Sequence, residues 1–304
     1  MIWTKKLYIL SIYIFARTAP HFWQRFQNRV VSYIYFLLWR SKRQPIMKNL
    51  SVITGKPESD PEIARLTRKM FENYGWYLRD YVLINSVTKR NFRKMVAEEH
   101  GTHYIKQALK DGKGAILITP HLGNWELGGI TLALRECHIY ALTLKDAQEE
   151  VQQFRDAMRG TLGVDTIHIN PDDQTTIIKI ARLLRQNKVV AMLGDRWEGG
   201  KKQQVTFFGR RVCFPSGAMA LAQATGCAVI PVFVVLRPDG RYRAWMEKPI
   251  KVERRAGQPP NELIAEKTQE LALVFEKVIR AYPDQWYQFF DFWSRYSCEK
   301  DSAA

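Results

Sequence analysis

The sequence predicts an α/β protein whose mostly parallel central sheet is flanked by helices. Beyond about residue 58, short apolar runs typical of buried strands alternate with longer amphipathic runs typical of helices. A chain of 304 residues with 46% hydrophobic residues can bury a full core, and no stretch is typical of a linker between two large domains. We therefore expect one domain over 58–304, preceded by an amphipathic helical extension over 1–57.

The extension is strongly basic. Residues 1–57 contain ten Lys or Arg and no Asp or Glu, whereas the net charge of the whole chain is +16. Two aromatic and apolar runs, 7–15 and 30–39, lie among these cations, and neither reaches the roughly 18 to 20 residues that a spanning helix needs. Such runs are typical of helices that lie in a membrane interface while Lys and Arg contact anionic lipid.

Two other interpretations of the extension stay open. The run 7–15 follows Lys5 and Lys6 and could be the apolar part of a signal peptide, although Arg17 and Pro20 form a poor cleavage context. A strongly basic protein also invites comparison with nucleic-acid binders. Here the cations are interleaved with long aliphatic and aromatic side chains, so we expect a membrane partner and no nucleic acid.

Periodicity and end signals then place the elements of the domain in order. A long helix over 60–84 begins at Ser59 or Asp60 with Pro61 in its first turn, and a second helix covers 102–111. The expected strands are 115–119, 139–144, 164–169, 189–193 and 228–236, and the helices that follow them are 125–136, 148–162, 173–186, 216–225 and 261–281.

The segment from Thr119 to Glu126 carries the clearest chemical signal. His121 follows an apolar strand, Glu126 comes five positions later, and Asn124 between them is a plausible N-cap for the next helix. An imidazole held by an ionised carboxylate can remove a proton from a hydroxyl, as acyl transfer to an alcohol requires. The two can meet if His121 lies in the turn and Glu126 in the first helical turn. A cap beside a surface histidine is the structural alternative.

An acid and an arginine follow another predicted strand. If strand 189–193 neighbours strand 115–119, Arg196 faces the same cleft as His121 and can bind a phosphate or carboxylate; a structural Asp195–Arg196 ion pair is the alternative. Arg159 lies on the helix 148–162, one turn after Arg155, where an exposed pair of arginines is commonplace.

A further basic pair precedes the helix 216–225. Arg210 and Arg211 lie shortly before Ser216, a plausible N-cap, and a helix N-terminus is a ready anion site. The same two arginines could instead form the tip of a basic hairpin.

The cysteines and the absence of known motifs limit the chemistry. Because the four cysteines show no C-x-x-C pairing and mostly lie in apolar runs, we expect reduced core thiols in a reducing compartment: Cys137, Cys213, Cys227 and Cys298. The chain has no H-E-x-x-H and no G-x-S-x-G, so we expect neither a metal nor a covalent acyl-enzyme.

From about residue 22 to 293 the chain resembles the lipid A late acyltransferases (lauroyl and myristoyl transferases) of the glycerolipid acyltransferase superfamily. The resemblance rests on the H-x4-D/E motif at 121–126, Gly-Asp-Arg at 194–196, Phe-Phe-Gly at 207–209, the strand with Pro231 and the segment 283–293. It implies that His121 is the general base and that Glu126 orients it. It also implies that Asp195 and Arg196 position the substrate and that Arg159 approaches the active site. Asn124, Arg210 and Arg211 are further candidates for substrate binding.

The resemblance further implies a reaction and a place. It predicts a membrane-associated O-acyltransferase on the cytoplasmic face of a bacterial inner membrane, which moves a fatty acyl group from acyl carrier protein or coenzyme A to a hydroxyl of a glycolipid. No cofactor beyond that thioester is expected, and backbone N–H groups near Gly123 and Asn124 would stabilise the oxyanion.

The sequence leaves several acceptors open. A lipid A precursor is the first expectation. However, the segment 290–293 reads Phe-Asp-Phe-Trp where lipid A enzymes continue into a basic His/Arg-Arg segment. A phosphatidylinositol mannoside, an ornithine lipid or an aryl polyene lipid are the alternative acceptors, and a non-catalytic basic membrane adaptor is the alternative outside enzymes.

Overall fold

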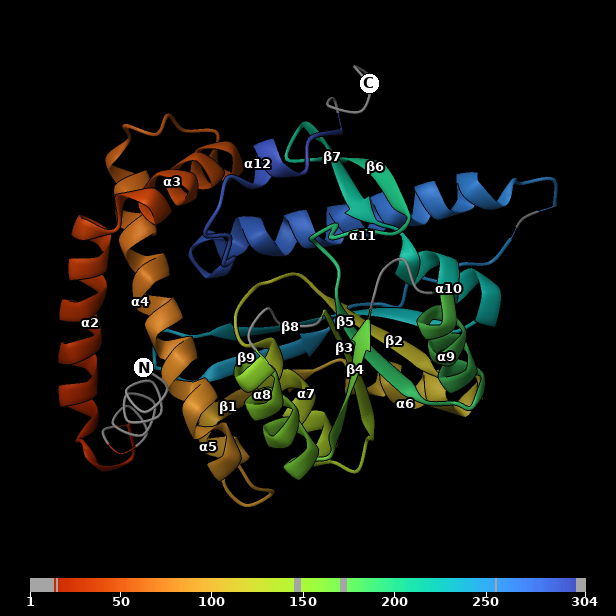
Figure 1. Ribbon diagram of the computed structural model, residues 1–304, viewed down its shortest axis with the longest axis horizontal. Coiled ribbons are helices and arrows are strands. Elements are labelled where there is room, and N and C mark those ends of the chain that lie inside the picture. The colour runs from red at the N-terminus through yellow and green to blue at the C-terminus, as the bar shows by residue number, and fades with distance from the viewer. Residues whose placement is uncertain (1–13, 15, 145–148, 170–173, 255, 299–304) are drawn as a thin grey trace.

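One sheet of seven strands forms the centre of the molecule (Figure 1). The structure is a computed structural model that describes residues 14, 16–144, 149–169, 174–254 and 256–298. The strand order is β1-β9-β8-β2-β5-β3-β4, and every neighbouring pair is parallel except β8 with β9. This confirms the predicted mostly parallel sheet. The strands are β1 Val96–His100, β2 Ala115–Thr119, β3 Ile139–Leu144, β4 Val164–Ile169, β5 Val189–Leu193, β8 Ala228–Leu236 and β9 Tyr242–Met246.

Helices cover both faces of this sheet (Figure 1). A separate antiparallel hairpin, β6 Lys202–Phe207 with β7 Arg210–Pro215, packs against α11. The described helices are α2 His21–Leu38, α3 Arg40–Thr54, α4 Pro61–Leu83, α5 Phe92–Met95, α6 Thr102–Lys110, α7 Trp125–Ala133, α8 Glu149–Thr161, α9 Gln174–Arg185, α10 Gly217–Thr225, α11 Pro260–Ala281 and α12 Phe292–Arg295, with single 3₁₀ turns at Ile84–Ser86 and Pro283–Gln285.

Strand β2 shows why a continuous apolar run marks the centre of such a sheet. All five of its residues are buried. Because successive side chains of a strand point to opposite faces, Ile116 and Ile118 pack with residues of α9, α10 and α11, while Ala115 and Leu117 pack with residues of α6 and α7. The sheet therefore has an apolar core on each side.

The chain leaves β2 and β5 in opposite directions, although these two strands are neighbours. From β2 it continues through α7 to β3 on one side, and from β5 it continues through the hairpin and α10 to β8 on the other. Thr119 pairs with Leu193, so both strands end at the same level. In open α/β sheets, ligands bind in the crevice at such a switch point.

The five predicted strands have their predicted bounds, whereas β1 and β9, the two outermost strands on one side of the sheet, were not predicted. β1 and β9 contain charged residues and are only partly buried, so neither shows the apolar run of a central strand. The predicted cap of the long helix is confirmed, because the Asp60 side chain accepts a hydrogen bond from the backbone N–H of Glu62 at 2.8 Å.

The two described helices of the expected extension differ in their environment. α3 buries Ile46, Leu50 and Ile53 in the main core. α2 packs along α4 and exposes many large apolar side chains to solvent: Phe22, Trp23, Phe26, Val30, Val31, Tyr33, Ile34, Tyr35, Leu37 and Leu38. The run 7–15 lies outside the described residues apart from Ile14. None of the helices described here is both long and apolar enough to cross a bilayer.

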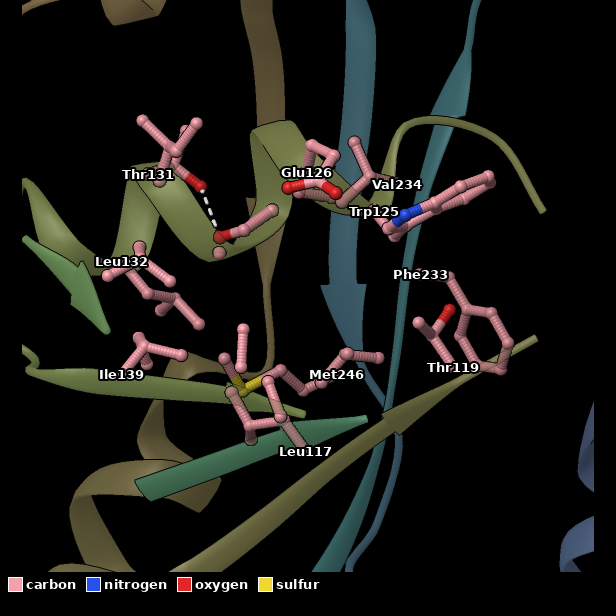
Figure 2. A pocket seen from close by; sticks show the side chains of 18 of the residues that line it. Leu117, Thr119, Trp125, Glu126, Thr131, Leu132, Ile139, Phe233, Val234 and Met246 are labelled. Carbon is pink, nitrogen blue, oxygen red and sulfur yellow. Dashed lines mark hydrogen bonds between the residues drawn. The ribbon is translucent and has the colours of Figure 1, made fainter. Parts of the chain in front are cut away.

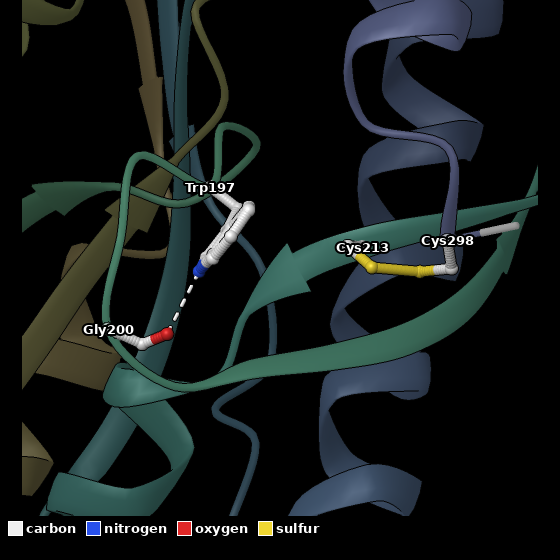
Figure 3. Close-up of a disulfide and its surroundings, with 4 residues drawn as sticks. All are labelled: Trp197, Gly200, Cys213 and Cys298. Atoms are coloured by element: carbon white, nitrogen blue, oxygen red, sulfur yellow. Dashed lines mark hydrogen bonds between the residues drawn. A yellow bond between two sulfur atoms is a disulfide. The ribbon is translucent and has the colours of Figure 1, made fainter. Parts of the chain in front are cut away.

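A disulfide joins Cys213 on β7 to Cys298 (Figure 3), so the expectation of four reduced thiols is wrong for this pair. The segment after α12 runs beside β7, where the backbone N–H of Cys213 donates to the carbonyl of Tyr296 at 2.8 Å. The two cysteines are 85 positions apart, and nothing in that spacing indicates their proximity. Cys137 and Cys227 are free.

Candidate active site

His121 and Asp195 meet at the switch point. His121 lies in the turn after β2, and Asp195 lies in the turn after β5. The Nδ1 atom of His121 is 2.6 Å from Oδ1 of Asp195, and the backbone N–H of His121 donates to Oδ2 at 3.0 Å. The imidazole is partly open to solvent, whereas the carboxylate is completely buried. No described residue makes a hydrogen bond to Nε2 of His121, so this nitrogen is available to a substrate.

The turn that carries His121 requires a glycine two residues later. Gly123 has a φ of +63°, and a Cβ atom added there would lie 1.9 Å from the carbonyl oxygen of Val234. The N–H of Gly123 donates to the carbonyl of Gln285, and the N–H of Asn124 donates to that of Val234. Because both N–H groups already have carbonyl partners, the expectation that they form the oxyanion site is wrong.

Glu126 does not contact His121 in this structure. Its two oxygens bind Arg159, from Nε at 3.1 Å and from Nη2 at 2.5 Å, and both side chains are about nine-tenths buried. Burial alone would lower the pKa of Arg159, but the charge of Glu126 and its hydrogen bonds raise that pKa overall. The prediction that Glu126 orients the base is therefore wrong in its geometry, because Asp195 holds the imidazole instead.

Asp195 is held ionised by an unusually complete set of partners. Its Oδ2 atom also accepts from Nε1 of Trp286 at 2.9 Å and from Nε2 of Gln288 at 2.8 Å. Burial favours the neutral acid, but the charge and hydrogen bonds of His121 and the charge of Arg196 outweigh it and lower the pKa of Asp195 to about 2. The carboxylate therefore stays charged at any pH at which the protein would work.

Two nitrogens of Arg196 make hydrogen bonds within the protein and do not face an open cleft. Nε donates to Oε1 of Gln288 and Nη2 donates to the carbonyl of Tyr287, both at 2.9 Å, and the guanidinium lies over the ring of Phe290. Burial lowers its pKa. These contacts favour a structural role for Arg196 over the predicted role in binding an anion.

The other predicted binding residues are dispersed. Asn124 is fully buried and caps α7, its Oδ1 accepting from the N–H of Leu127 at 3.0 Å, which confirms the predicted cap. Arg210 and Arg211 are exposed at the start of β7, on the hairpin and outside the central sheet. The structure thus gathers His121, Asp195 and Arg196 at the switch point and leaves the hairpin arginines apart from them.

Trp286 and Gln288 were not assigned to the site from the sequence. They lie in the segment 283–293, which contributes to the resemblance but in which no residue was given a role. The only signal that could have pointed to them is the pair of polar hydrogen-bonding groups, an indole N–H and an amide, inside an otherwise apolar run.

An apolar cavity of about 130 Å³ lies between α7 and the sheet. Figure 2 shows Thr119 and Trp125 at one end of it and Leu132 and Ile139 at the other. Small residues on both sides leave room for the cavity. On the sheet these are Ala141, Ala191 and Ala244, and on α7 they are Gly128 and Gly129. Glu126 and Arg159 also line it.

Trp125 connects the cavity with the imidazole. Its ring lies edge-on to His121 with the ring centroids 5.5 Å apart, and the same ring lines the cavity. The ring of Trp125 also packs with that of Tyr77 on α4, with the ring centroids 5.0 Å apart. One end of the apolar space therefore lies next to the His121–Asp195 pair, although His121 itself does not line it.

Comparison with known proteins shows the family of this chain. A sequence model described as bacterial lipid A biosynthesis acyltransferase matches residues 1–295. The chain belongs to this family. Among curated relatives, a phosphatidylinositol mannoside acyltransferase of Mycobacterium tuberculosis is 27% identical over 254 residues, covering 82% of this chain and 77% of the relative. One with the same name from Mycolicibacterium smegmatis is 25% identical over 252 residues, covering 82% and 79%.

For an acyltransferase, the arrangement offers a histidine that can act as a base. A histidine whose Nδ1 is held by a buried carboxylate can accept a proton at Nε2, and the resulting imidazolium is stabilised by that carboxylate. The Glu126–Arg159 pair lines the cavity near this base and fixes α7 to α8.

Proposed function

We propose that this acyltransferase moves a fatty acyl group from a thioester of acyl carrier protein or coenzyme A to a hydroxyl of a membrane glycolipid. The observation that carries the proposal is the His121–Asp195 pair at the shared end of β2 and β5, with Trp125 between it and an apolar cavity. The same pair without a neighbouring apolar space would suit many reactions, whereas the combination suits transfer of a hydrocarbon chain.

In the proposed reaction, Nε2 of His121 takes the proton of the acceptor hydroxyl while its oxygen attacks the thioester carbonyl carbon. Asp195 remains ionised and stabilises the imidazolium. When the tetrahedral intermediate collapses, the carbon–sulfur bond breaks and the leaving thiolate takes the proton from His121. The products are the new ester and a free thiol, and the protein returns to its starting state.

The cavity is the proposed site of the acyl chain. Alternate residues of two strands line it. They are Leu117 and Thr119 on β2, and Ile139, Ala141 and Thr143 on β3. Two residues of a strand span roughly 6.6 Å, so the lined stretch of β3 extends roughly 13 Å from the strand ends. Burying methylene groups in this space would provide about 0.8 kcal/mol each.

The membrane is the proposed location of the enzyme, with the thioester donor on its cytoplasmic face. α2 exposes Trp23, Phe26 and Leu38 as well as Arg25 and Arg29. A helix with exposed aromatic residues and arginines is suited to the headgroup region of an anionic bilayer. Its contact with α4, which carries Tyr77 next to Trp125, would bring the lipid surface near the site.

Two acceptors merit direct comparison. A lipid A precursor follows from the family description, and a phosphatidylinositol mannoside follows from the names of the curated relatives. Both offer hydroxyl groups on an anionic glycolipid, and the proposed base would serve either.

The proposal is tested with the purified full-length protein and its His121→Ala and Asp195→Asn variants. Palmitoyl-coenzyme A and palmitoyl acyl carrier protein are each offered with a lipid A precursor or a phosphatidylinositol mannoside, and products are read by mass spectrometry. We expect ester formation with one acceptor, and rates at least 10³-fold lower in both variants because each removes part of the general base.

A second histidine–aspartate pair provides the control. His138 and Asp165 are joined at 2.9 Å by Nε2 and Oδ2 but are exposed. His138→Ala should keep the rate within about twofold. Full acyl transfer by His121→Ala would overturn the proposed base, and no transfer to any glycolipid by wild-type protein would overturn the proposed function. Lipids from cells with and without the gene would then identify the acceptor by the acyl chain that is lost.

A further inference from the structure

We propose that Gln288 and Trp286 are positioning residues that set the pH range over which His121 acts, by loading one oxygen of Asp195 with hydrogen bonds. The inference rests on the proposed function, because it assumes that His121 is the base. It assigns a role to two side chains in the segment after α11, which neither the motif around His121 nor the Gly-Asp-Arg block contains.

The two oxygens of Asp195 have different partners. Oδ1 faces Nδ1 of His121, while Oδ2 accepts from the Trp286 indole, the Gln288 amide and the backbone N–H of His121. Trp286 is fully buried and Gln288 is 1% exposed, so water does not compete for these bonds. The carboxylate is therefore fixed in one orientation, with Oδ1 reserved for the imidazole.

The orientation of Gln288 is itself fixed by a cation. Its Oε1 accepts from Nε of Arg196 at 2.9 Å, so its amide N–H groups are directed to Asp195. Arg196 in turn is held by the carbonyl of Tyr287 and the ring of Phe290. The Gly-Asp-Arg block thus acts on the base partly through Gln288, which explains an arginine that is buried in protein contacts at this position.

Hydrogen bonds to Oδ2 draw negative charge away from Oδ1. A carboxylate that lacks one of these donors keeps more charge at the oxygen facing the imidazole, and this stabilises the protonated ring more strongly. Loss of either donor should therefore keep His121 protonated to higher pH. Since only the neutral ring can accept a proton, the acidic limb of kcat/KM should move to higher pH.

Trp286→Phe leaves the contacts of the other charged and titratable groups around the pair unchanged, whereas Gln288→Met also removes the acceptor of the Arg196 Nε–H. Arg196 adjoins Asp195 on the β5 side, and the Glu126–Arg159 pair lies on α7 and α8. Tyr77 of α4 and Tyr287 are buried, and burial keeps the pKa of each well above its ordinary value, so both are neutral in the working range.

The test compares Gln288→Met and Trp286→Phe, which remove one donor each, with Gln285→Met as the matched control. Gln288→Met changes the side-chain shape little, whereas Trp286→Phe also leaves a cavity in the core. Gln285 is equally buried in the same segment, but its amide bonds only the backbone of Leu236 at 2.8 Å. Loss of those bonds should lower the melting temperature without affecting Asp195.

For both test variants we expect the acidic limb of kcat/KM to move up by roughly half to one pH unit and kcat at neutral pH to fall roughly 10- to 100-fold. The Gln285→Met limb should stay at the wild-type pH. A lower melting temperature in all three variants with no movement of any limb would show a merely structural role and overturn the inference.

A readout without catalysis separates this inference from the proposed function. Histidine labelled with ¹⁵N reports ring protonation by NMR, and the His121 signals are assigned with the His121→Ala variant. We expect half-protonation of the ring at higher pH in Gln288→Met and Trp286→Phe than in wild type, whether or not an acceptor has been found. An unchanged titration would overturn the inference even if acyl transfer by His121 were established.

Discussion

Ala191 lies halfway along β5, where its side chain lines the apolar cavity opposite α7. It is level with Leu117 on β2 and with Ala141 on β3. A larger side chain here would divide the space about two residues below the strand ends. If the cavity holds the acyl chain, this one position controls how much hydrocarbon fits.

We therefore predict that Ala191→Leu shifts donor preference to shorter chains. The kcat/KM for palmitoyl donor should fall at least roughly tenfold, while that for hexanoyl donor should stay within about threefold, because displacement of a few methylenes at about 0.8 kcal/mol each affects only the long chain. Ala157→Leu, on the exposed side of α8, is the control. An equal loss for all chain lengths would place the acyl chain elsewhere.

Single residues also show how far the site could be predicted. His121 and the cap formed by Asn124 follow from local signals, a base just past an apolar strand and a side chain that bonds the helix N-terminus. The partner of His121 could not be inferred from separation along the chain. Asp195 is 74 positions away and becomes adjacent only because β5 pairs with β2, whereas the nearer Glu126 is bound by Arg159.

Among the elements, α2 differs from the other helices in what it exposes. Trp23 and Phe26 are 51% and 59% exposed and lie on the same face, one turn apart. Exposed aromatic residues on a cationic helix are expected to enter the headgroup region of a bilayer.

We predict that Trp23→Ser with Phe26→Ser weakens binding to vesicles that contain phosphatidylglycerol by roughly 10- to 100-fold, because the apolar area that enters the lipid is lost. Flotation of vesicles with the protein measures this. The matched control replaces two exposed apolar residues on other helices, Ile178→Ser with Leu273→Ser. If the control variant loses as much binding as the α2 variant, α2 is not the contact surface.

Elements whose own residues show a clear hydrophobic pattern could be predicted from the sequence. Elements that form only because of the strands beside them could not. β2 and β5 are apolar runs with clear ends. β1, with the sequence Val-Ala-Glu-Glu-His, is a strand because it pairs with β9 at the sheet edge, and no property of those five residues alone requires it. The same holds for the disulfide, which depends on β7 lying beside the segment after α12.

At the scale of the whole molecule, the Cys213–Cys298 disulfide closes a loop of 85 residues that includes β8, β9 and α11. A cross-link of this kind mainly restricts the unfolded chain. We predict that Cys298→Ser lowers the free energy of unfolding by about 2–4 kcal/mol, measured by denaturant titration without reductant.

Two controls make this prediction specific. Cys137→Ser, at a free cysteine, should change stability by less than about 1 kcal/mol. Dithiothreitol should lower the stability of wild type to that of Cys298→Ser and leave the variant unchanged. Titration of four thiols in the unreduced, denatured wild type would contradict the disulfide.

The position of Trp286 and Gln288 in the chain has a consequence for biosynthesis. A ribosome completes all seven strands of the sheet, and with them the cavity and His121, before it reaches the two residues that bind Oδ2 of Asp195. A nascent chain can thus have its sheet complete while the proposed base still lacks these contacts to Asp195. The order of translation would delay the proposed reactivity toward thioesters until the segment with Trp286 and Gln288 has been made.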